Sequence, residues 1–511
     1  MTIDDTTPVL IGAGQFAERV GEEGYEGLAN YELAAKAGER ALADVGANQP
    51  IAGHIDALAA VRTFEDVSPV LGQPFGKSSA FPWSVAKRLD ADPDHVVYED
   101  VGGQSPQNLV TEFGGRIAAG EFGVVLLCGA ENISTVTHLQ RSGGSADWSE
   151  AIDRPMESRL SDNKGMINRD MVAHQLIRAP ENYALSENAR RRRLGMSRED
   201  YAQAMGELFA PFTKVAAENP YSAQAIEPMS AEEIAFASEK NRWITTPYPI
   251  RLVAKEKVNQ GAALLLASVA KARELGVPQE KWVFLHGACG LVEPGLWERA
   301  DISASPAAQM VASIALERAS VGIGDIGHFD FYSCFPIAVA NSAIDGLGMA
   351  ADDPRGLTLT GGLPYFGGAG NNYSMHAIAE MIIRLRGDPG SFGLVSANGG
   401  YLTKTSVGVY STVPREWRDM GSAELQAGID AAPKPVWTSE AEGDAVLESY
   451  TIHHGRDGPT IGVIYGRLGS GEAFLANNAD AETLATMVED DPLGAKITVE
   501  RGEKANLFRF G

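Results

Sequence analysis

The sequence predicts an α/β protein built from two similar sheet-containing halves, a helical insertion and a small all-β module. Three observations support this prediction. In residues 1–130, short apolar strands alternate with helices, which is typical of a parallel or mixed sheet covered on both faces. The same alternation returns in residues 251–413, after a polar helical stretch. Residues 434–511 instead show strands punctuated by Gly and Asp turns, as in small barrel-like domains.

Four apolar strands define the first half. We expect these strands at Val9–Gln15, Ile55–Val61, His95–Tyr98 and Gly123–Cys128, with helices at Tyr31–Val45, at Ser84–Leu89 and in the stretch that ends near Ala119. The first helix shows apolar residues at the helical period, and Gly46 supplies its stop signal.

The turn Val101–Gln107, with the sequence VGGQSPQ, lies where a strand ends and a helix begins. Its two glycines allow close backbone packing, and the first N–H groups of the helix point into the same space. Many α/β enzymes carry a nucleophile at such a turn. Here the turn offers only small or neutral side chains, namely Gly102, Gly103, Gln104 and Ser105.

The insertion, residues 131–250, is polar, helical and rich in Arg and Met. It contains the run Arg190–Arg193. The sequence supports two interpretations of this run equally well: a solvated helix face or a phosphate-binding group. Ser197 followed by Asp200 resembles a helix-capping arrangement. An insertion of this kind usually covers an active site or a partner surface.

The second half repeats the pattern of the first. We expect strands at Gly261–Ala267, Trp282–His286, His328–Tyr332, Leu394–Gly400 and Thr405–Tyr410, and helices at Pro306–Arg318, Ile337–Asp345 and His376–Arg386. The segments HVVYEDVGGQSPQNLV and HFDFYSCFPIAVANSA each contain an apolar strand, a turn and a helix start, which indicates a pseudo-repeat. In the C-terminal module we expect strands at Val446–Ile452, Thr460–Tyr465 and Lys496–Glu500.

Charge and cysteine content narrow the functional classes. The formal net charge of −24 over 511 residues argues against nucleic acid or an anionic membrane as partner. The three cysteines show no metal-ligand or disulfide spacing, so we expect no metal site and a reducing, cytoplasmic location. The N-terminus lacks the features of a signal peptide, and no apolar run reaches the roughly 18 residues of a membrane span.

The residues resemble the thiolase superfamily over roughly residues 7–413. The resemblance is to its sterol-carrier-thiolase-like and thiolase-like protein type 1 branches. It rests on the helix Leu33–Gly46, on Cys128–Ser134 (like GGxExMS), on Ser197–Ala202, on Asn259–Ala262 (like NDGA) and on Gly361-Gly362 before a glycine loop. The resemblance implies a layered αβαβα core of two similar halves. The type 1 branch also carries an additional C-terminal β domain, which suits residues 434–511.

The family's catalytic motifs are altered in this sequence. The resemblance matches Gly103 to the nucleophilic Cys, Gly368 to the His of the GHP motif and Ala397 to the acid/base Cys of the CxG motif. Tyr332-Ser-Cys-Phe335 matches the HDCF form of a fourth motif only at its last two residues. Glycine and alanine can neither attack a thioester nor carry a proton, so we do not expect covalent acyl transfer. Ser105 is the only hydroxyl on the turn, but the matched family position is structural.

Other polar groups near the matched positions are the remaining site candidates. The candidate catalytic residues are Tyr332, Tyr373, His376 and Cys334. The candidate groups for binding coenzyme A (CoA) are Gly103, Gln104, Ser105, Asn371, Asn372, Gly368 and Asn398. Each candidate also has a purely structural alternative. The tyrosines can be packed rings with hydrogen-bonded hydroxyls, His376 can be a core histidine, and Cys334 can be a small buried residue. A phenol with a lowered pKa can accept the proton of a β-hydroxyl group while an oxyanion site holds the enolate.

Two functions remain open. The first is a nominal acyltransferase that performs Cys-independent C–C bond chemistry on an acyl-CoA, such as retro-aldol or retro-Claisen cleavage. The second is a catalytically silent acyl-CoA or lipid-binding protein whose β domain recruits a protein partner. CoA enters either function only as part of the substrate, with no tightly bound cofactor. Thiolases usually dimerise, but the insertion and the added domain can block that surface, so dimer and monomer both remain open.

Overall fold

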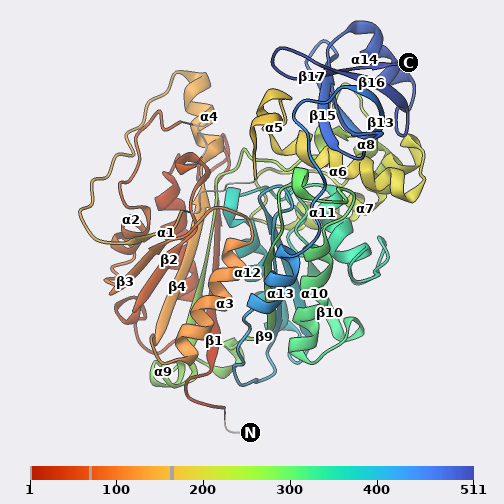
Figure 1. Ribbon diagram of the computed structural model, residues 1–511. Coiled ribbons are helices and arrows are strands. Elements are labelled where there is room, and N and C mark those ends of the chain that lie inside the picture. The colour runs from red at the N-terminus through yellow and green to blue at the C-terminus, as the bar shows by residue number, and fades with distance from the viewer. Residues whose placement is uncertain (1–2, 68–71, 161–165) are drawn as a thin grey trace.

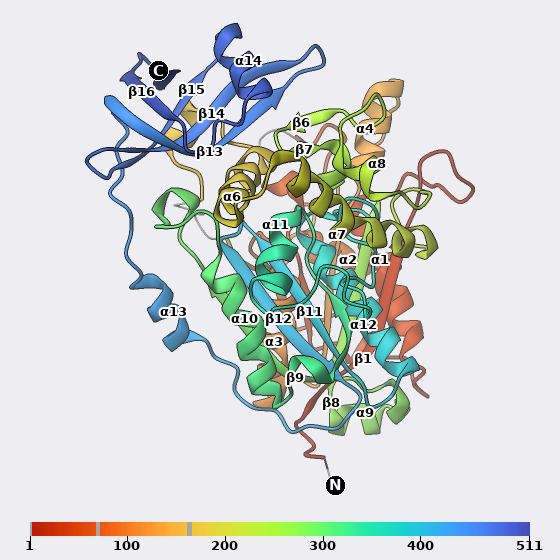
Figure 2. The same ribbon diagram turned by 90° about the vertical axis from the view of Figure 1, so that its right-hand side faces the viewer.

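Two β-sheets stack face to face, with helices between them and outside them (Figure 1). The computed structural model describes residues 3–67, 72–160 and 166–511. The expected layered αβαβα core is present, and a β-barrel lies beside the insertion at one end of it (Figure 2). Within the described residues, every helix is too short or too polar to cross a lipid bilayer.

The first sheet has the strand order β1-β8-β4-β2-β3-β5. Its strands are β1 (Pro8–Ala17), β2 (Ala57–Ala60), β3 (His95–Tyr98), β4 (Val124–Glu131), β5 (Glu157–Ser158) and β8 (Gln260–Ser268). β8 follows the insertion in sequence, yet it pairs antiparallel with both β1 and β4 in the first sheet. Both faces of the sheet are covered, which explains why β4 and β8 are continuous apolar runs without polar alternation.

The second sheet has the order β10-β11-β12-β9. Its strands are β9 (Phe284–Val292), β10 (Ile326–Asp330), β11 (Phe392–Gly399) and β12 (Lys404–Ser411). β10 ends two residues earlier than the sequence pattern predicts, so Tyr332 lies in the loop that follows the strand. The predicted helix after this loop is α11 (Pro336–Val339), which passes directly into one π-helical segment at Ala340–Ile344.

Helices fill three layers around the two sheets. The central layer is α3 (Ser105–Ala118) and α12 (Tyr373–Gly387), whose apolar residues pack in one cluster with residues of both sheets. Outside the first sheet lie α1 (Asn30–Asp44) and α2 (Phe81–Arg88). Outside the second sheet lie α10 (Pro306–Ala319) and α11. The short helices α4 (Ile133–Ser142) and α9 (Val269–Glu274) follow β4 and β8 directly.

The insertion forms a helical layer beside the barrel. Its elements are α5 (Arg169–Ala173), α6 (Ala179–Leu194), α7 (Arg198–Glu218), α8 (Ala231–Ala235), β6 (Trp243–Thr245) and β7 (Tyr248–Pro249). The Ser197 hydroxyl accepts a hydrogen bond from the Asp200 N–H at 3.0 Å, so the predicted cap of α7 is confirmed. A connector that contains α13 (Ala423–Asp430) leads from β12 to the barrel.

The C-terminal module is a closed five-stranded barrel. Its elements are β13 (Gly443–His454), β14 (Pro459–Leu468), β15 (Ala473–Asn478), α14 (Ala481–Glu489), β16 (Lys496–Arg501) and β17 (Asn506–Phe510). The order β14-β15-β17-β16-β13 closes because β13 also pairs with β14. This five-stranded order, with a helix between the third and fourth strands, is an OB-type topology. The module was predicted as all-β, so α14 is an addition to the prediction.

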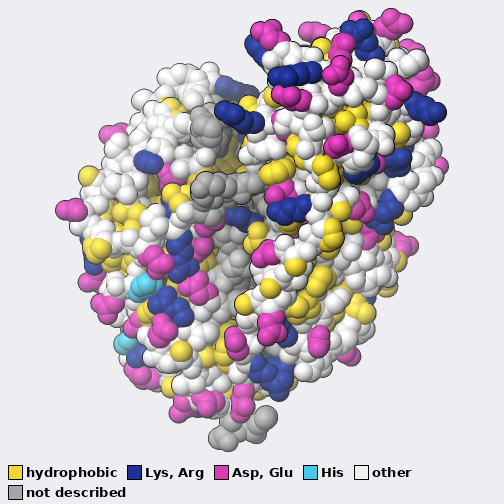
Figure 3. Space-filling view, in the orientation of Figure 1, with side chains coloured by type: hydrophobic (Ala, Val, Ile, Leu, Met, Phe, Trp, Pro, Cys, Tyr) yellow, Lys and Arg dark blue, Asp and Glu magenta, His cyan; other side chains and the backbone are white. Residues whose placement is uncertain are grey.

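The first two residues of the Arg190–Arg193 run form neither a solvated helix face nor a free phosphate-binding group. Arg190 is paired with Asp345 at 2.7 Å, and Arg191 is paired with Asp491 of the barrel at 2.6 Å. Both arginines are buried because α6 lies between the core and the barrel (Figure 2). On the face shown in Figure 3, basic and acidic side chains are interspersed over the barrel surface.

Candidate functional site

The turn before α3 has no room for a side chain at position 103. A Cβ atom built on Gly103 would lie 2.3 Å from the Tyr332 hydroxyl oxygen and 2.4 Å from the Asn398 carbonyl oxygen. Contacts of that length do not occur for real Cβ atoms, so any side chain at this position requires a shift of neighbouring atoms. The Tyr332 hydroxyl therefore occupies the space into which a side chain of residue 103 would project.

Some polar groups of the turn are held by protein atoms. Gly102, with a φ of +135°, donates its N–H to Asn371 Oδ1 at 2.9 Å. The Ser105 hydroxyl donates to the Asp100 carbonyl at 3.0 Å, so it binds the backbone of the turn. The Ser374 hydroxyl on α12 donates to the Gly103 carbonyl at 2.6 Å.

Three hydrogen-bonding groups of the turn are left without a protein partner. In the part of the chain that the structure describes, the N–H groups of Gly103 and Gln104 donate no hydrogen bond. The side-chain oxygen Oε1 of Gln104 is also buried without a partner there. Buried polar groups are normally satisfied, so this local deficit is typical of a place where a ligand supplies the missing partner.

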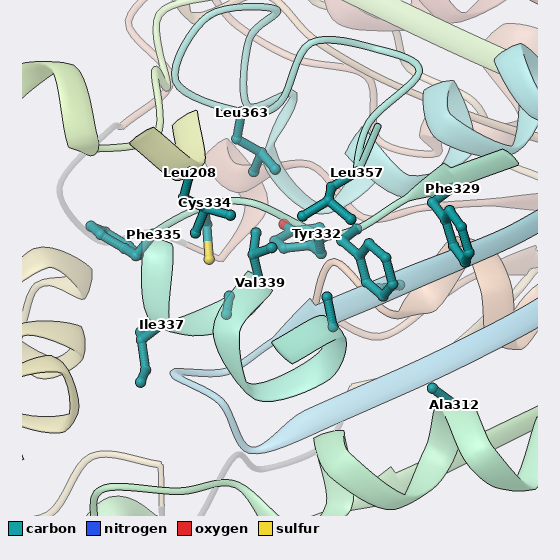
Figure 4. Packing of buried hydrophobic residues seen from close by; sticks show 14 of the residues in the cluster. Leu208, Ala312, Phe329, Tyr332, Cys334, Phe335, Ile337, Val339, Leu357 and Leu363 are labelled. Carbon is teal, nitrogen blue, oxygen red and sulfur yellow. The ribbon is translucent and has the colours of Figure 1, made fainter. Parts of the chain in front are cut away.

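Four side chains gather beside this turn, and we call them the tyrosine cluster: Tyr183, Tyr332, Cys334 and Asn398. The Asn398 amide nitrogen donates to the Tyr183 hydroxyl at 2.8 Å and lies 3.6 Å from the Cys334 sulfur. The ring of Tyr183 stacks on Phe335, with centroids 4.3 Å apart. Tyr332, Cys334 and Phe335 follow one another in the segment between β10 and α11 (Figure 4).

The cluster is enclosed, but it is not sealed. Gln104, Tyr332, Cys334 and Asn398 each keep an exposed fraction of 7% or 8%, whereas Tyr373 and His376 are fully buried. Burial raises the pKa of the Cys334 thiol to about 12, so the thiol stays protonated and a poor nucleophile. Burial also raises the pKa values of Tyr183 and Tyr332 well above the ordinary value.

Tyr373 lies behind Tyr332 and is fully satisfied. The two rings meet edge-on, with centroids 5.2 Å apart. The Tyr373 hydroxyl is 2.6 Å from the Thr360 hydroxyl and donates to the buried Asp330 carboxylate at 3.2 Å. Burial and the Asp330 charge raise the pKa of Tyr373, which is the opposite of the lowered pKa that a tyrosine base requires.

His376 belongs to a different polar group. Its Nδ1 atom lies 2.7 Å from Gln15 Oε1, and the Gln15 amide in turn donates to Glu380 at 2.8 Å. Burial lowers the pKa of His376 to about 3, so the ring is neutral at physiological pH. The structure thus gives this histidine the contacts of a core residue and does not bring it into the tyrosine cluster.

The remaining predicted residues hold loops in place. The Asn371 amide donates to the Arg62 carbonyl at 2.8 Å, and the Asn372 amide donates to the Gly129 carbonyl at 2.7 Å. Gly368 donates its N–H to the Lys255 carbonyl at 2.8 Å. A Cβ atom at Gly368 would meet that carbonyl at 3.3 Å, so this position is much less crowded than Gly103.

Sequence reasoning missed Tyr183 and Asp330. Tyr183 lies on α6 in the polar insertion, where no local pattern distinguishes it from the residues around it. Asp330 is the last residue of β10 and accepts hydrogen bonds from Thr358, Leu359 and Thr360. A charged residue between the aromatic residues of the predicted strand His328–Tyr332 was the available signal for Asp330.

The tyrosine cluster provides hydrogen-bond donors for a negative charge. Its tyrosines do not have the lowered pKa that a general base requires. Tyrosines with raised pKa values keep their protons, so they can donate hydrogen bonds to a developing oxyanion. The N–H groups of Gly103 and Gln104, which have no hydrogen-bond partner among the described residues, belong to the turn beside Tyr332.

Comparisons with known proteins bear on the family and on the fold. A family model described as the thiolase-like protein type 1 additional C-terminal domain matches residues 424–504. The chain is 46% identical, over all of both chains, to a solved monomeric SCP2-thiolase-like protein type 1 from Mycobacterium smegmatis, with a TM-score of 0.86. A search of curated proteins found no match.

Two more distant structures share the fold of the core. One is described as an Ltp2-ChsH2(DUF35) aldolase, with 20% identity, a TM-score of 0.56 and coverage of 80% of this chain and 98% of that one. The other is the dimeric peroxisomal thiolase of Saccharomyces cerevisiae, with 14% identity, a TM-score of 0.57 and the same coverage.

Proposed function

The chain belongs to the SCP2-thiolase-like protein type 1 family of the thiolase superfamily, and on this premise we propose that it binds an acyl-CoA at the turn before α3. The thioester carbonyl accepts hydrogen bonds from the Tyr332 hydroxyl and from the N–H groups of Gly103 and Gln104. One observation carries the proposal: the Tyr332 hydroxyl takes the side-chain space of Gly103, beside N–H groups that lack protein partners.

The proposed chemistry is a C–C bond step that needs no cysteine, such as retro-aldol or retro-Claisen cleavage. In a retro-aldol step the β-hydroxyl proton passes to water, the Cα–Cβ bond breaks to release a carbonyl product, and the resulting enolate takes up a proton from water. In a retro-Claisen step water or free CoA first adds to the β-carbonyl. In both cases donors at the thioester oxygen stabilise the enolate. Gly103 cannot form an acyl-enzyme, and the protonated Cys334 thiol is a poor substitute, so ordinary acyl transfer is not part of this proposal. The description of one thiolase-fold neighbour as an aldolase is in keeping with this choice.

The first test replaces Tyr332 by Phe, with Tyr373→Phe as the matched control. Loss of one oxyanion donor should lower turnover roughly 100-fold or more, while the affinity for free CoA stays within a factor of about three. Tyr373→Phe should lower stability more than turnover, because its hydroxyl is engaged by Asp330 and Thr360. Turnover is followed by mass spectrometry on a panel of β-hydroxyacyl-CoA and β-ketoacyl-CoA thioesters.

Two results would overturn the proposal. One is an intact-mass adduct that shows a covalent acyl-enzyme after incubation with any thioester of the panel. The other is equal turnover of wild type and Tyr332→Phe on a substrate that the wild type cleaves.

A catalytically silent acyl-CoA or lipid-binding protein is the second candidate. The raised pKa values of Tyr183, Tyr332 and Tyr373 favour it, because none of these hydroxyls is prepared to accept a proton. In this case CoA binds to the wild type, and no thioester of the panel is cleaved.

We propose that the chain is monomeric, as the Mycobacterium smegmatis relative is described. In the first sheet, β5 pairs with β3 at Val97 and Tyr98, so this part of the β3 edge is already paired within the chain. Light scattering coupled to size-exclusion chromatography should then report about the chain mass of 54.3 kDa, and a mass twice as large would contradict the proposal.

A further inference from the structure

Helix α6 links the tyrosine cluster to the C-terminal barrel. It is buried from Pro180 to Arg191, and it lies between the barrel and the core (Figure 2). Towards its N-terminus, Tyr183 contacts Asn398 and the Cys334 thiol. One turn further on, the Glu187 carboxylate accepts the Ile337 N–H at 2.8 Å, next to the cluster loop. The helix is therefore fixed to the site by two of its residues.

Other residues of α6 are fixed to the barrel. The Asn188 amide donates to the Tyr450 carbonyl at 2.9 Å, and the Ser449 hydroxyl donates to the Leu185 carbonyl at 2.5 Å. Arg191 donates to both Asp491 oxygens, at 2.6 and 2.8 Å. Arg191 is only 2% exposed, so Asp491 offsets the cost of burying its positive charge.

An apolar contact reinforces these hydrogen bonds. Side chains of β14 and β15 pack in one cluster with Leu185 and Ala189 of α6 and with Met171 and Leu176. In OB-type barrels, the face of the second and third strands is the usual ligand-binding face. In this chain those strands are β14 and β15, and their face is covered by the chain's own helices.

We propose that the barrel is a positioning element of the site: its docking on α6 holds Tyr183 against Asn398 and Cys334. Tyr183 is a rigid part of one buried helix, so a shift of that helix moves its hydroxyl away from the loop that carries Cys334. The barrel then acts on the site through α6. The inference rests on the proposed function only in taking this cluster as the acyl-CoA site.

The test weakens barrel docking by Asp491→Asn and measures the alkylation rate of Cys334 by iodoacetamide. Loss of the contacts with Tyr183 should raise the rate of Cys334 at least threefold. Cys128 on β4 is buried in a different core cluster, and Cys289 on β9 is buried in the same cluster as Cys334 but on a strand of the second sheet, so the two serve as a distant and a near internal control. Peptide mass spectrometry separates the three sites.

Three further variants sharpen the test. Asp491→Glu, which keeps the charge, should restore at least part of the protection. Ser449→Ala removes one barrel–α6 hydrogen bond without an ionic change and should act in the same direction as Asp491→Asn. Glu500→Gln removes an ion pair with Arg509 on the exposed surface of the barrel and should leave all three rates unchanged.

An unchanged Cys334 rate in both Asp491→Asn and Ser449→Ala overturns the inference. An equal rise at all three cysteines also overturns it, because it shows general loosening of the fold. Alkylation needs no bound ligand, so failure of CoA to bind would refute the proposed function and leave this result standing. If CoA binds, its affinity should fall at least threefold in Asp491→Asn.

Discussion

At the scale of single residues, the glycine at position 103 and the position of the Tyr332 side chain depend on each other. The glycine is required because the Tyr332 hydroxyl and the Asn398 carbonyl leave no space for a Cβ atom. The sequence shows that a glycine stands at position 103, but it does not show which distant side chain fills the space. That contact depends on how β10, β11 and α3 come together.

Substitution of Gly103 by Ala should destabilise the protein by about 1 to 3 kcal/mol, which is the usual cost of overpacking. The clash with the Asn398 backbone oxygen remains even when Tyr332 is truncated, so Tyr332→Ala should rescue the variant only in part. Urea unfolding followed by tryptophan fluorescence measures the change.

Gly368→Ala is the matched control, because its Cβ atom would meet nothing closer than 3.3 Å. A small adjustment accommodates this methyl group, so the loss should stay below about 1 kcal/mol. Equal losses at the two positions would refute the crowding argument at Gly103.

At the scale of elements, most helices and strands lie where the residue patterns predict them. β3 has the predicted bounds, and α10 differs from the predicted helix by one residue. β15 and β17 were not among the strands named for the C-terminal module, although β17 alternates between buried and exposed residues. The early end of β10 has a tertiary cause: Asp330 is held by the threonine loop at 358–360, and the chain turns away there.

The connector after β12 is anchored to α3 through Trp417. A Cβ atom at Gly114 would lie 2.8 Å from the Trp417 ring, whereas one at Gly115 would lie 3.6 Å away. Gly115→Ala should therefore stabilise the protein by about 0.5 to 1 kcal/mol, because alanine is the better helix former.

Gly114→Ala should destabilise the protein instead, because the methyl group displaces the Trp417 ring. Thermal unfolding of the two variants followed by circular dichroism gives shifts of opposite sign if the contact is as described. Shifts of the same sign would mean that Trp417 does not limit the space at α3.

At the scale of the whole molecule, several buried or half-buried histidines are held in the neutral form. Burial lowers the pKa of His286, His453 and His454 to about 4, and that of His376 to about 3. Because the unfolded chain binds these protons more readily, folding stability is complete above the unfolded pKa of about 6.5. It falls as the pH decreases towards each folded pKa and then levels off.

His376 isolates this effect, because its ring is fully buried. It should account for a loss of about 2 kcal/mol between pH 7.5 and pH 5, given about 1.4 kcal/mol per unit of pKa shift. His376→Asn keeps a donor for Gln15 and cannot be protonated, so its stability should fall by about 2 kcal/mol less than that of the wild type over this range. An identical pH dependence in urea unfolding of the two proteins would contradict the buried neutral state.

The sequence alone determined two α/β halves, the insertion and the C-terminal β module, because apolar periodicity and turn residues are local properties of the chain. The family resemblance implied their layered αβαβα arrangement. It also indicated the glycine turn at 102–103. Only the tertiary structure decided that Tyr332 fills the side-chain space of Gly103, that Tyr183 from the insertion joins it, and that Arg191 binds the barrel. These contacts join segments far apart in the chain, and close packing of whole elements, which no local pattern encodes, sets their geometry.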